Sequence, residues 1–483
     1  MNNFLPFVDI FHWYNKLKMK LFSKSRHYSL SPFKITIINL LFGLPNHSLT
    51  SEETIKQLVK FEKFSIFFRA SRFGFNQNVS HQSAKTDYFR LIIRAIDQIT
   101  LIRCICLTLI DNEDYQLYLG DFAYKTKYRS MINILMSISF SLGAVNSELI
   151  VLYDKSGKYS VLTIYSDIIK NGFDPVHLQM TSNQAINFHR SIHILVTQLN
   201  RSFIFICFFV EPCYYTILLF NPHFYQVKPL PYFSLAWSLV VIFVAVALFG
   251  RYFAIFGYIF LIQAYSMHKL RSVVELSDSY RRLKCTDELA STFIKYTFEC
   301  LNQWEKSAHL TGALVFSAFA VIVPIGDLLI FYGFIVRFHS PLFANSVGSL
   351  GCIAFTVIGY LSLIGREFII KIERSYSNLQ IMCRYNALDV HNQFKLLQLM
   401  ERLSDPNIGI QLGSIITIRK DFFIKVSITD LLFFQSHSRK KIPNKYRIYI
   451  NKYIDYLDCG RDVVDEDGAL VVGGAEVTDE YTP

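Results

Sequence analysis

The chain has 483 residues, of which 52% are hydrophobic and only 18% are charged, and its formal net charge is +11. Average soluble domains carry about 25% charged residues, so this composition argues against a soluble protein and favours a membrane protein. No basic cluster coincides with a nucleic-acid-binding fold, so we expect no nucleic-acid partner and interpret the positive charge as attraction to anionic membrane lipid. The nine cysteines form no CxxC pair, which indicates neither a metal site nor a disulfide framework.

The first 90 residues contain no cleavable signal peptide, because Asp9 and His12 interrupt the opening apolar residues before a hydrophobic region forms. We predict residues 1–90 to be a cytoplasmic N-terminal region. The first membrane span then acts as its own insertion signal.

The strongest apolar segment runs from Phe233 to Gly250 without a charged side chain and resumes after Arg251 as far as Tyr265. About 20 apolar residues cross a bilayer as a helix, because each backbone N–H and C=O has to be satisfied within its own segment. Similar segments recur along the chain and predict one all-α, polytopic membrane domain over residues 91–436 with seven transmembrane helices. The predicted spans are 91–110, 131–153, 202–220, 232–265, 310–336, 343–365 and 408–435.

The connections between spans differ in charge. Segments 266–309 and 366–407 carry seven and six lysine or arginine residues, whereas segments 221–231 and 337–342 carry one each. Positive residues stay on the cytoplasmic side. We therefore predict a multi-pass protein of the cell membrane with its N-terminus inside and its C-terminus outside, the opposite of a G-protein-coupled receptor.

Residues 380–403 predict an amphipathic cytoplasmic helix, on which His391, Lys395 and Arg402 share a polar stripe. Two interpretations of its apolar residues stay open. Either the helix lies against the inner end of its own bundle, or it anchors one subunit to another. The candidate anchor residues are Phe394, Leu397, Met400 and Leu403.

The segment that follows reads LSDPNIGIQLGSIITIRKDFFIKVSITDLLFFQS, in which a short Thr-Ile-Arg-Lys turn joins two apolar halves. It resembles the closing segment of the insect-type gustatory receptors, seven-helix chemoreceptors of the arthropod gustatory and odorant receptor superfamily. It departs from that family's pattern between Thr429 and Ser436, where four apolar residues replace five and Asp430 replaces a tyrosine. The matching residues are Gly413, Ile416, Thr417, Ile418, Phe422 and Phe423.

This resemblance implies a ligand-gated, non-selective cation channel that is a homo- or hetero-tetramer and is opened by a small-molecule tastant or another chemical ligand. The final helix of each subunit would line the pore. On that helix Ile428, Leu432 and Gln435 share one stripe, which gives two apolar rings and then a polar ring near the outer mouth. From the residues alone, ordinary packing of this stripe against a neighbouring helix stays open.

Asp430 is an ionisable residue inside a predicted span, which by default indicates a functional site. It lies about 140° around the helix from Gln435. It either attracts cations to the pore or pairs with Lys425 or a neighbouring subunit, and the sequence favours neither interpretation.

Other candidate sites are weaker. His189 and His193 have the i, i+4 spacing of a metal site, but Arg190 stands where a HExxH hydrolase has its glutamate, so we interpret them as a solvated cytoplasmic pair. No nucleotide-binding or hydrolase motif appears, so we expect no enzyme, no metal and no cofactor. The ligand site stays unassigned, because aromatic and polar residues within spans are routine packing or border residues. Those considered are Tyr214, Tyr215, Trp237 and Asp327.

Two alternative functions remain, a G-protein-coupled receptor and a membrane transporter, although no internal repeat supports the latter. Residues 437–483 are basic and then acidic and Gly-rich, which predicts a disordered tail. The glycosylation sequons at Asn46, Asn78 and Asn200 all fall on the predicted inner side, so we expect none to carry sugar.

Overall fold

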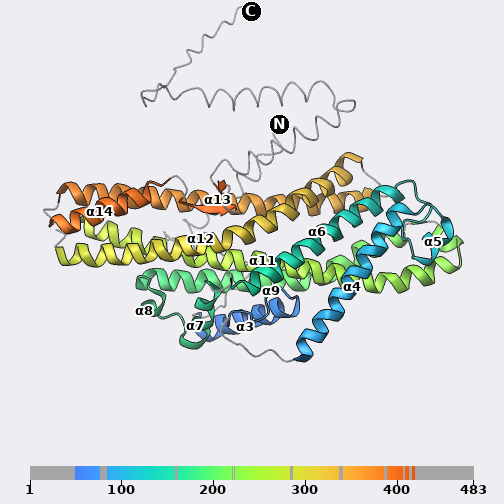
Figure 1. Cartoon of the computed structure of the whole chain (residues 1–483), viewed down its shortest axis with the longest axis horizontal. Coiled ribbons are helices and arrows are strands. Elements are labelled where there is room, and N and C mark those ends of the chain that lie inside the picture. Colours follow the sequence, from blue (N-terminus) through green and yellow to red (C-terminus); the bar gives the residue numbers. More distant parts are fainter. Residues whose placement is uncertain are drawn as a thin grey trace, which may run out of the picture. The chain divides into compact units, whose positions relative to one another are not determined.

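The computed structural model describes residues 49–76, 84–157, 161–219, 221, 223–282, 287–336, 341–385, 389–405, 408–412 and 416–418. These residues are almost entirely helical (Figure 1). The helices are α3 Ser51–Phe67, α4 Ala84–Leu109, α5 Glu113–Tyr118, α6 Arg129–Lys155, α7 Thr163–Asn171, α8 Pro175–Leu178, α9 Ser182–Leu219, α10 His223–Gln226, α11 Pro229–Arg282, α12 Asp287–Ile330, the π-helical turn η2 Phe331–Val336, α13 Pro341–Tyr385 and α14 Val390–Leu403. The strands are β1 Ile410–Leu412 and β2 Ile416–Ile418.

Predicted spans 131–153, 232–265 and 343–365 lie within α6, α11 and α13, and 310–336 covers the end of α12 and η2. Among the described residues, four helices are long and apolar enough to cross a membrane, over Arg129–Lys155, Pro229–Ser279, Ala290–Phe334 and Ala344–Arg384. Predicted spans 91–110 and 202–220 overlap α4 and α9 and are not among these four. The first contains three charged residues, Arg94, Asp97 and Arg103, and the second runs largely over side chains outside the described part. The chain is thus a helical protein with several membrane-spanning helices.

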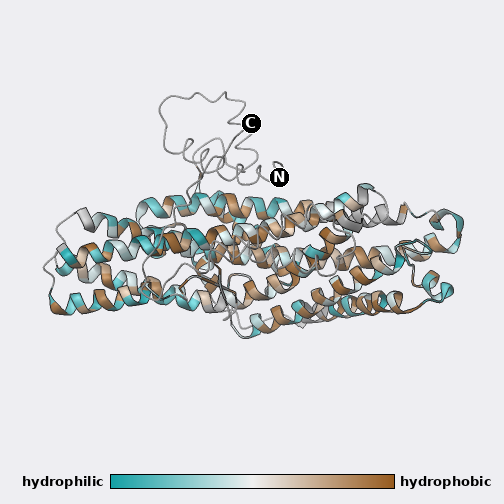
Figure 2. Cartoon of the chain, turned by 90° about the horizontal axis from the view of Figure 1, so that it is seen from above, coloured by the Kyte–Doolittle hydropathy of each residue, from teal (hydrophilic) through white to brown (hydrophobic). Residues whose placement is uncertain are grey.

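Three of these helices are much longer than a bilayer requires. The longest, α11, has 54 residues, and at about 1.5 Å per residue it extends for roughly 80 Å, whereas the hydrocarbon core is about 30 Å thick. In Figure 2 the long helices are hydrophilic towards the ends near α8 and α14 and hydrophobic over most of their remaining length. The predicted spans are therefore only the apolar parts of helices that continue beyond the membrane.

The predicted anchor helix over 380–403 is not continuous, because α13 ends at Tyr385 and α14 begins at Val390. The Asp389 carboxylate caps α14 by accepting a hydrogen bond from the Asn392 N–H at 2.7 Å. The Asp389 N–H in turn donates to the Asp287 carboxylate at the start of α12, at 2.9 Å. A capping residue within the amphipathic pattern thus starts a new helix.

The beginning of the predicted seventh span is also wrong, since residues 410–412 and 416–418 form two antiparallel strands, a hairpin, rather than a helix. Its register pairs Ile410 with Ile418 and Leu412 with Ile416. The three isoleucines are β-branched and favour strands. Gly409 permits a close approach, because a Cβ there would lie 2.3 Å from the Thr417 methyl group. The remainder of that span, 419–435, lies outside the described residues.

The N-terminal region contains α3, which hydropathy did not predict. A capping box starts it: the Thr50 hydroxyl accepts from the Glu53 N–H at 3.4 Å, and the Glu53 carboxylate accepts from the Thr50 N–H at 3.3 Å. The buried side of α3 packs between α9 and α11, where Phe61 is fully buried. At Asn200, a predicted unglycosylated sequon, the side chain is buried and donates to the Gln57 carbonyl at 3.0 Å.

Phe61 of α3 fits against a glycine of α11. A Cβ on Gly257 would lie 2.4 Å from the Phe61 ring, and Phe61 is enclosed by Phe75, Phe203 and Tyr258. A rigid ring in a filled site has nowhere to move. The glycine therefore allows α3 to dock.

We expect Gly257→Ala to destabilise the protein by about 1–3 kcal/mol through overpacking, measured as thermal unfolding of the purified full chain in detergent. Gly143→Ala is the matched control, because its Cβ would meet a flexible Leu248 methyl group at 3.1 Å. Equal stability of the two variants would contradict this account of how α3 docks.

Candidate functional site

The four predicted pore residues, Ile428, Asp430, Leu432 and Gln435, lie outside the described residues. The structure does describe the hairpin that leads to them. β1 contacts α12 and β2 contacts α13, and the Ile418 carbonyl oxygen lies 2.5 Å from the position that a Cβ on Gly365 would occupy. The chain thus approaches the predicted pore segment at Gly365, where the predicted sixth span ends.

The predicted anchor residues divide between two faces of α14. Leu403 is buried, and Met400 packs against the same cluster, which includes Leu396 and Leu399. This cluster joins α14 to α12 and α13, where Trp304 and Phe368 pack with ring centroids 4.4 Å apart. Phe394 and Leu397 instead remain 64% and 55% exposed, on the same side as Val390.

His189 and His193 are not the solvated pair that the sequence suggested. The Thr54 hydroxyl of α3 lies 2.9 Å from Nε2 of His189 and 3.1 Å from Nδ1 of His193. His193 is buried, and the ring of half-buried His189 stacks on Phe173 at 4.3 Å. Burial lowers the pKa of His189, and the neighbouring His193 lowers it further. The pair therefore holds α3 to α9, a role that only the fold reveals.

A second polar group joins the N-terminal end of α9 to α11 and α12. Buried His268 bonds through its two ring nitrogens to Gln184 and Ser191, each at 3.1 Å. The Thr181 hydroxyl donates to Glu275 at 2.7 Å, and the buried Lys269 ammonium donates to Gln179 at 2.6 Å. Polar groups this deep are stabilising only when they are bonded, so these contacts fix the mutual positions of the helices.

Arg251, the one charge inside the longest apolar run, is 3% exposed. Its guanidinium donates to the Phe68 carbonyl at 3.1 Å and to the Ser147 hydroxyl, and it pairs with the Asp97 carboxylate at 3.9 Å. A charge within a membrane span is costly unless it is paired. Arg251 therefore binds α11 to α4, α6 and the end of α3.

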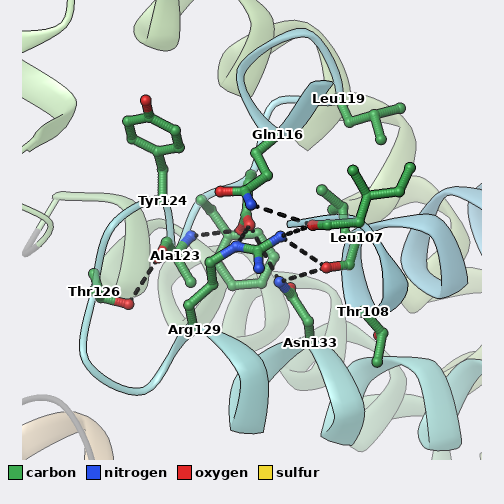
Figure 3. A network of polar contacts seen from close by, with 12 residues as sticks. Leu107, Thr108, Gln116, Leu119, Ala123, Tyr124, Thr126, Arg129 and Asn133 are labelled. Carbon is green, nitrogen blue, oxygen red and sulfur yellow. Dashed lines mark hydrogen bonds and ion pairs between the residues drawn. The ribbon is translucent and has the colours of Figure 1, made fainter. Parts of the chain in front are cut away.

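The connection between α4 and α6 forms a third polar network (Figure 3). Asp121 is fully buried, accepts from Arg129 at 2.5 Å and from Asn133 at 3.2 Å, and caps the Ala123 N–H at 3.0 Å. Arg129 also donates to the Leu107 carbonyl at 2.8 Å. The loop is thus tied to the ends of both helices and is a rigid part of the structure.

The structure assigns no ligand contact to the aromatic and polar candidates. Trp237 lies under the Arg103 guanidinium at 5.0 Å, and Arg103 also donates to the carbonyls of Leu119 and Gly120 at 2.8 Å each. Asp327 is half-buried, and the side chains of Tyr214 and Tyr215 lie outside the described part. No group of three metal-binding side chains occurs among the described residues.

No protein-family model matches the chain, and no curated protein matches its sequence. Solved structures do resemble it, and among them are two of the insect olfactory receptor OR5 from Machilis hrabei. The receptor alone aligns with a TM-score of 0.55 at 13% identity, over 78% of this chain and 96% of the receptor. Its complex with eugenol aligns with a TM-score of 0.54 at 12% identity, over 79% and 98%.

The chain shares the fold of this olfactory receptor. The alignment spans nearly the whole receptor, so the match concerns the order and packing of the helices together rather than a shared pair of helices. The closing-segment resemblance had predicted this fold. At 12–13% identity the likeness concerns the backbone, so the polar contacts above are properties of this chain.

We expect the fold of this chain to depend on the Arg251 pairing, which a double-mutant cycle tests. Arg251→Met leaves Asp97 buried without its partner, and we expect a loss of about 3 kcal/mol. Adding Asp97→Asn should restore part of the lost free energy of unfolding, so that the effects of the two substitutions are not additive. The measurement is thermal unfolding of the purified full chain.

The control is Arg374→Met, which breaks an ion pair with Asp278 whose arginine side chain is 54% exposed. Exposed pairs contribute about 0–1 kcal/mol, so this variant should unfold close to the wild type. Additive effects of the Asp97 and Arg251 substitutions would contradict the proposed pairing.

Proposed function

We propose that this chain is a subunit of a ligand-gated, non-selective cation channel of the insect chemoreceptor type, and within that class a gustatory-type receptor. The observation that carries the proposal is the likeness of its fold to nearly the full length of an insect olfactory receptor. The closing-segment residues favour the gustatory branch. A small organic molecule is the expected class of ligand, since the olfactory receptor was solved with eugenol.

The exposed side of α14 supports an assembly of several subunits. Val390, Phe394 and Leu397 are between 55% and 68% exposed, on a helix that continues the hydrophilic part of the bundle beyond the spans (Figures 1 and 2). Apolar side chains in water favour burial against a partner. A second copy of α14 or of its neighbours is the partner that a tetrameric channel provides.

The hairpin supports the pore assignment. It brings the chain to the predicted sixth span at Gly365. The sequence predicts that the segment that follows carries Ile428, Leu432 and Gln435 on one helical stripe. Apolar rings gate a pore by dewetting, and a ring of amides coordinates a partly hydrated cation. Four copies of this segment around one axis would form such rings.

The G-protein-coupled receptor is not favoured, because the fold resembles the insect receptors and the charge bias predicts the opposite orientation. The transporter alternative has no supporting observation among the described residues. The proposed assembly and pore each have a separate test.

Assembly is tested with the double variant Phe394→Ser/Leu397→Ser. We expect it to shift the purified protein from a tetramer to smaller species while the monomer keeps its thermal stability, because both side chains are exposed in the single chain. Leu396→Ser is the contrasting control. It places a polar side chain in the buried cluster and should unfold the monomer itself. The measurement is mass photometry. An unchanged tetramer in the double variant would refute the anchor.

Permeation is tested with Asp430→Asn and Gln435→Ala in cells that express the full chain. Currents are evoked with a panel of small organic molecules that begins with eugenol, and reversal potentials are measured in exchanged salt solutions. We expect Asp430→Asn to reduce selectivity for cations over anions and Gln435→Ala to change the order of permeability among cations. Wild-type reversal potentials in both variants would remove these residues from the pore.

A further inference from the structure

Helix α3 has a second face that the bundle does not cover. Its buried residues are Thr54, Leu58, Phe61 and Ser65. The opposite side carries Lys56, Lys60, Lys63 and Phe67, all exposed. These four residues are spaced by four, three and four positions and therefore form one stripe along the helix. We call them the lysine stripe.

The acidic residues of α3 do not neutralise Lys60 and Lys63, the two lysines nearer the C-terminal end of the helix. The Glu53 carboxylate is used in the cap, and the Glu62 carboxylate accepts from the Phe75 N–H at 2.8 Å on the other side of the helix. Glu52 lies at the outer end of the stripe, one turn before Lys56. No ion pair joins a lysine of the stripe to any described residue, and the Lys60 ammonium lies 5.8 Å from the Phe64 ring.

The stripe has a defined depth relative to the membrane. Near its end, α3 packs on the start of predicted span 202–220, where the Phe203 ring lies 5.2 Å from Phe64 and 5.3 Å from Phe68. Its beginning lies at His189 and His193, more than two turns ahead of that span. Helix α3 therefore runs from the cytoplasmic side to the inner boundary of the membrane.

The lysines lie at and just outside the depth of lipid headgroups. Along the helix axis Lys63, Lys60 and Lys56 lie about 6, 10 and 16 Å outside Phe67. The headgroup layer occupies about 5–8 Å beyond the hydrocarbon core, so Lys63 lies within it and the other two lie on its aqueous side. On the membrane side the stripe itself ends in Phe67, which is 62% exposed. Along the stripe the surface of α3 thus changes from basic to apolar, as a lipid does from headgroup to acyl chain.

We propose that the lysine stripe binds an anionic phospholipid of the cytoplasmic leaflet. The ammonium groups of Lys63 and Lys60 contact its phosphate oxygens as point charges. Lys56 attracts the anionic headgroup from the aqueous side, within about one Debye length, and Phe67 lies beside its acyl chains. The proposal rests on the inside N-terminus of the proposed function. Its consequence is regulatory: α3 supplies the Phe68 carbonyl that Arg251 binds, so an anionic lipid that holds α3 also stabilises the charge cluster.

The test is native mass spectrometry of the full chain purified in detergent and titrated with phosphatidylserine, phosphatidylcholine or inorganic phosphate. The variant is Lys56→Gln/Lys60→Gln/Lys63→Gln. The control is Lys170→Gln/Lys295→Gln/Lys306→Gln, which removes the same charge from three other exposed lysines. The variant Lys56→Arg/Lys60→Arg/Lys63→Arg preserves the charge and guards against misfolding as the cause of a loss.

We expect the wild type, the control and the arginine variant to retain phosphatidylserine over phosphatidylcholine, and the glutamine variant of the stripe to bind it about tenfold or more weakly. If both glutamine variants retained phosphatidylserine equally, or lost it equally, the lysine stripe would not be its binding site. Inorganic phosphate that displaces the lipid would show a free-anion site instead and would also overturn it. The readout needs neither a ligand nor an open channel, so an absence of currents leaves it unaffected.

Discussion

The buried guanidinium of Arg251 is the constraint on which the arrangement of the helices depends. It stands in the longest apolar run, where a lone charge would be costly, and its donors reach the Phe68 carbonyl, Ser147 and Asp97. Those partners belong to three other segments. Four parts of the chain have to meet at one level for this charge to be satisfied, so the helices cannot slide past one another without exposing it.

Polar networks on either side of this level serve the same purpose. The Asp121 group ties the α4–α6 connection to both helices, and the His268 group ties α9 to α11. Between them, contacts are mostly apolar and less directional. Towards the inner ends, the apolar cluster under α14 joins α12 and α13. In the proposed channel this gives each subunit a fixed frame from which the hairpin leads to the pore segment.

Six of the predicted spans overlap helices of the structure, and four of these helices are long and apolar enough to cross a membrane, because the bilayer allows few alternatives to a helix. Hydropathy did not find α3, whose sequence is mostly polar on one side, or the break at Asp389, which depends on a cap. Hydropathy predicts a helix where strands 410–412 and 416–418 lie, because short apolar runs occur in both helices and strands. His189 and His193 were interpreted as solvated because their partner Thr54 is 135 residues away from His189 in the sequence. Pairings over such distances come from the fold and not from local pattern.

The inner-leaflet position of α3, the cytoplasmic anchor and the pore all depend on one orientation in the membrane. Epitope tags at Met1 and Pro483 measure it directly, by antibody access to intact and then permeabilised cells, without knowledge of the ligand. The account predicts a C-terminal tag accessible in intact cells and an N-terminal tag accessible only after permeabilisation. An N-terminal tag that is accessible in intact cells, with the C-terminal tag protected, would contradict the proposed channel.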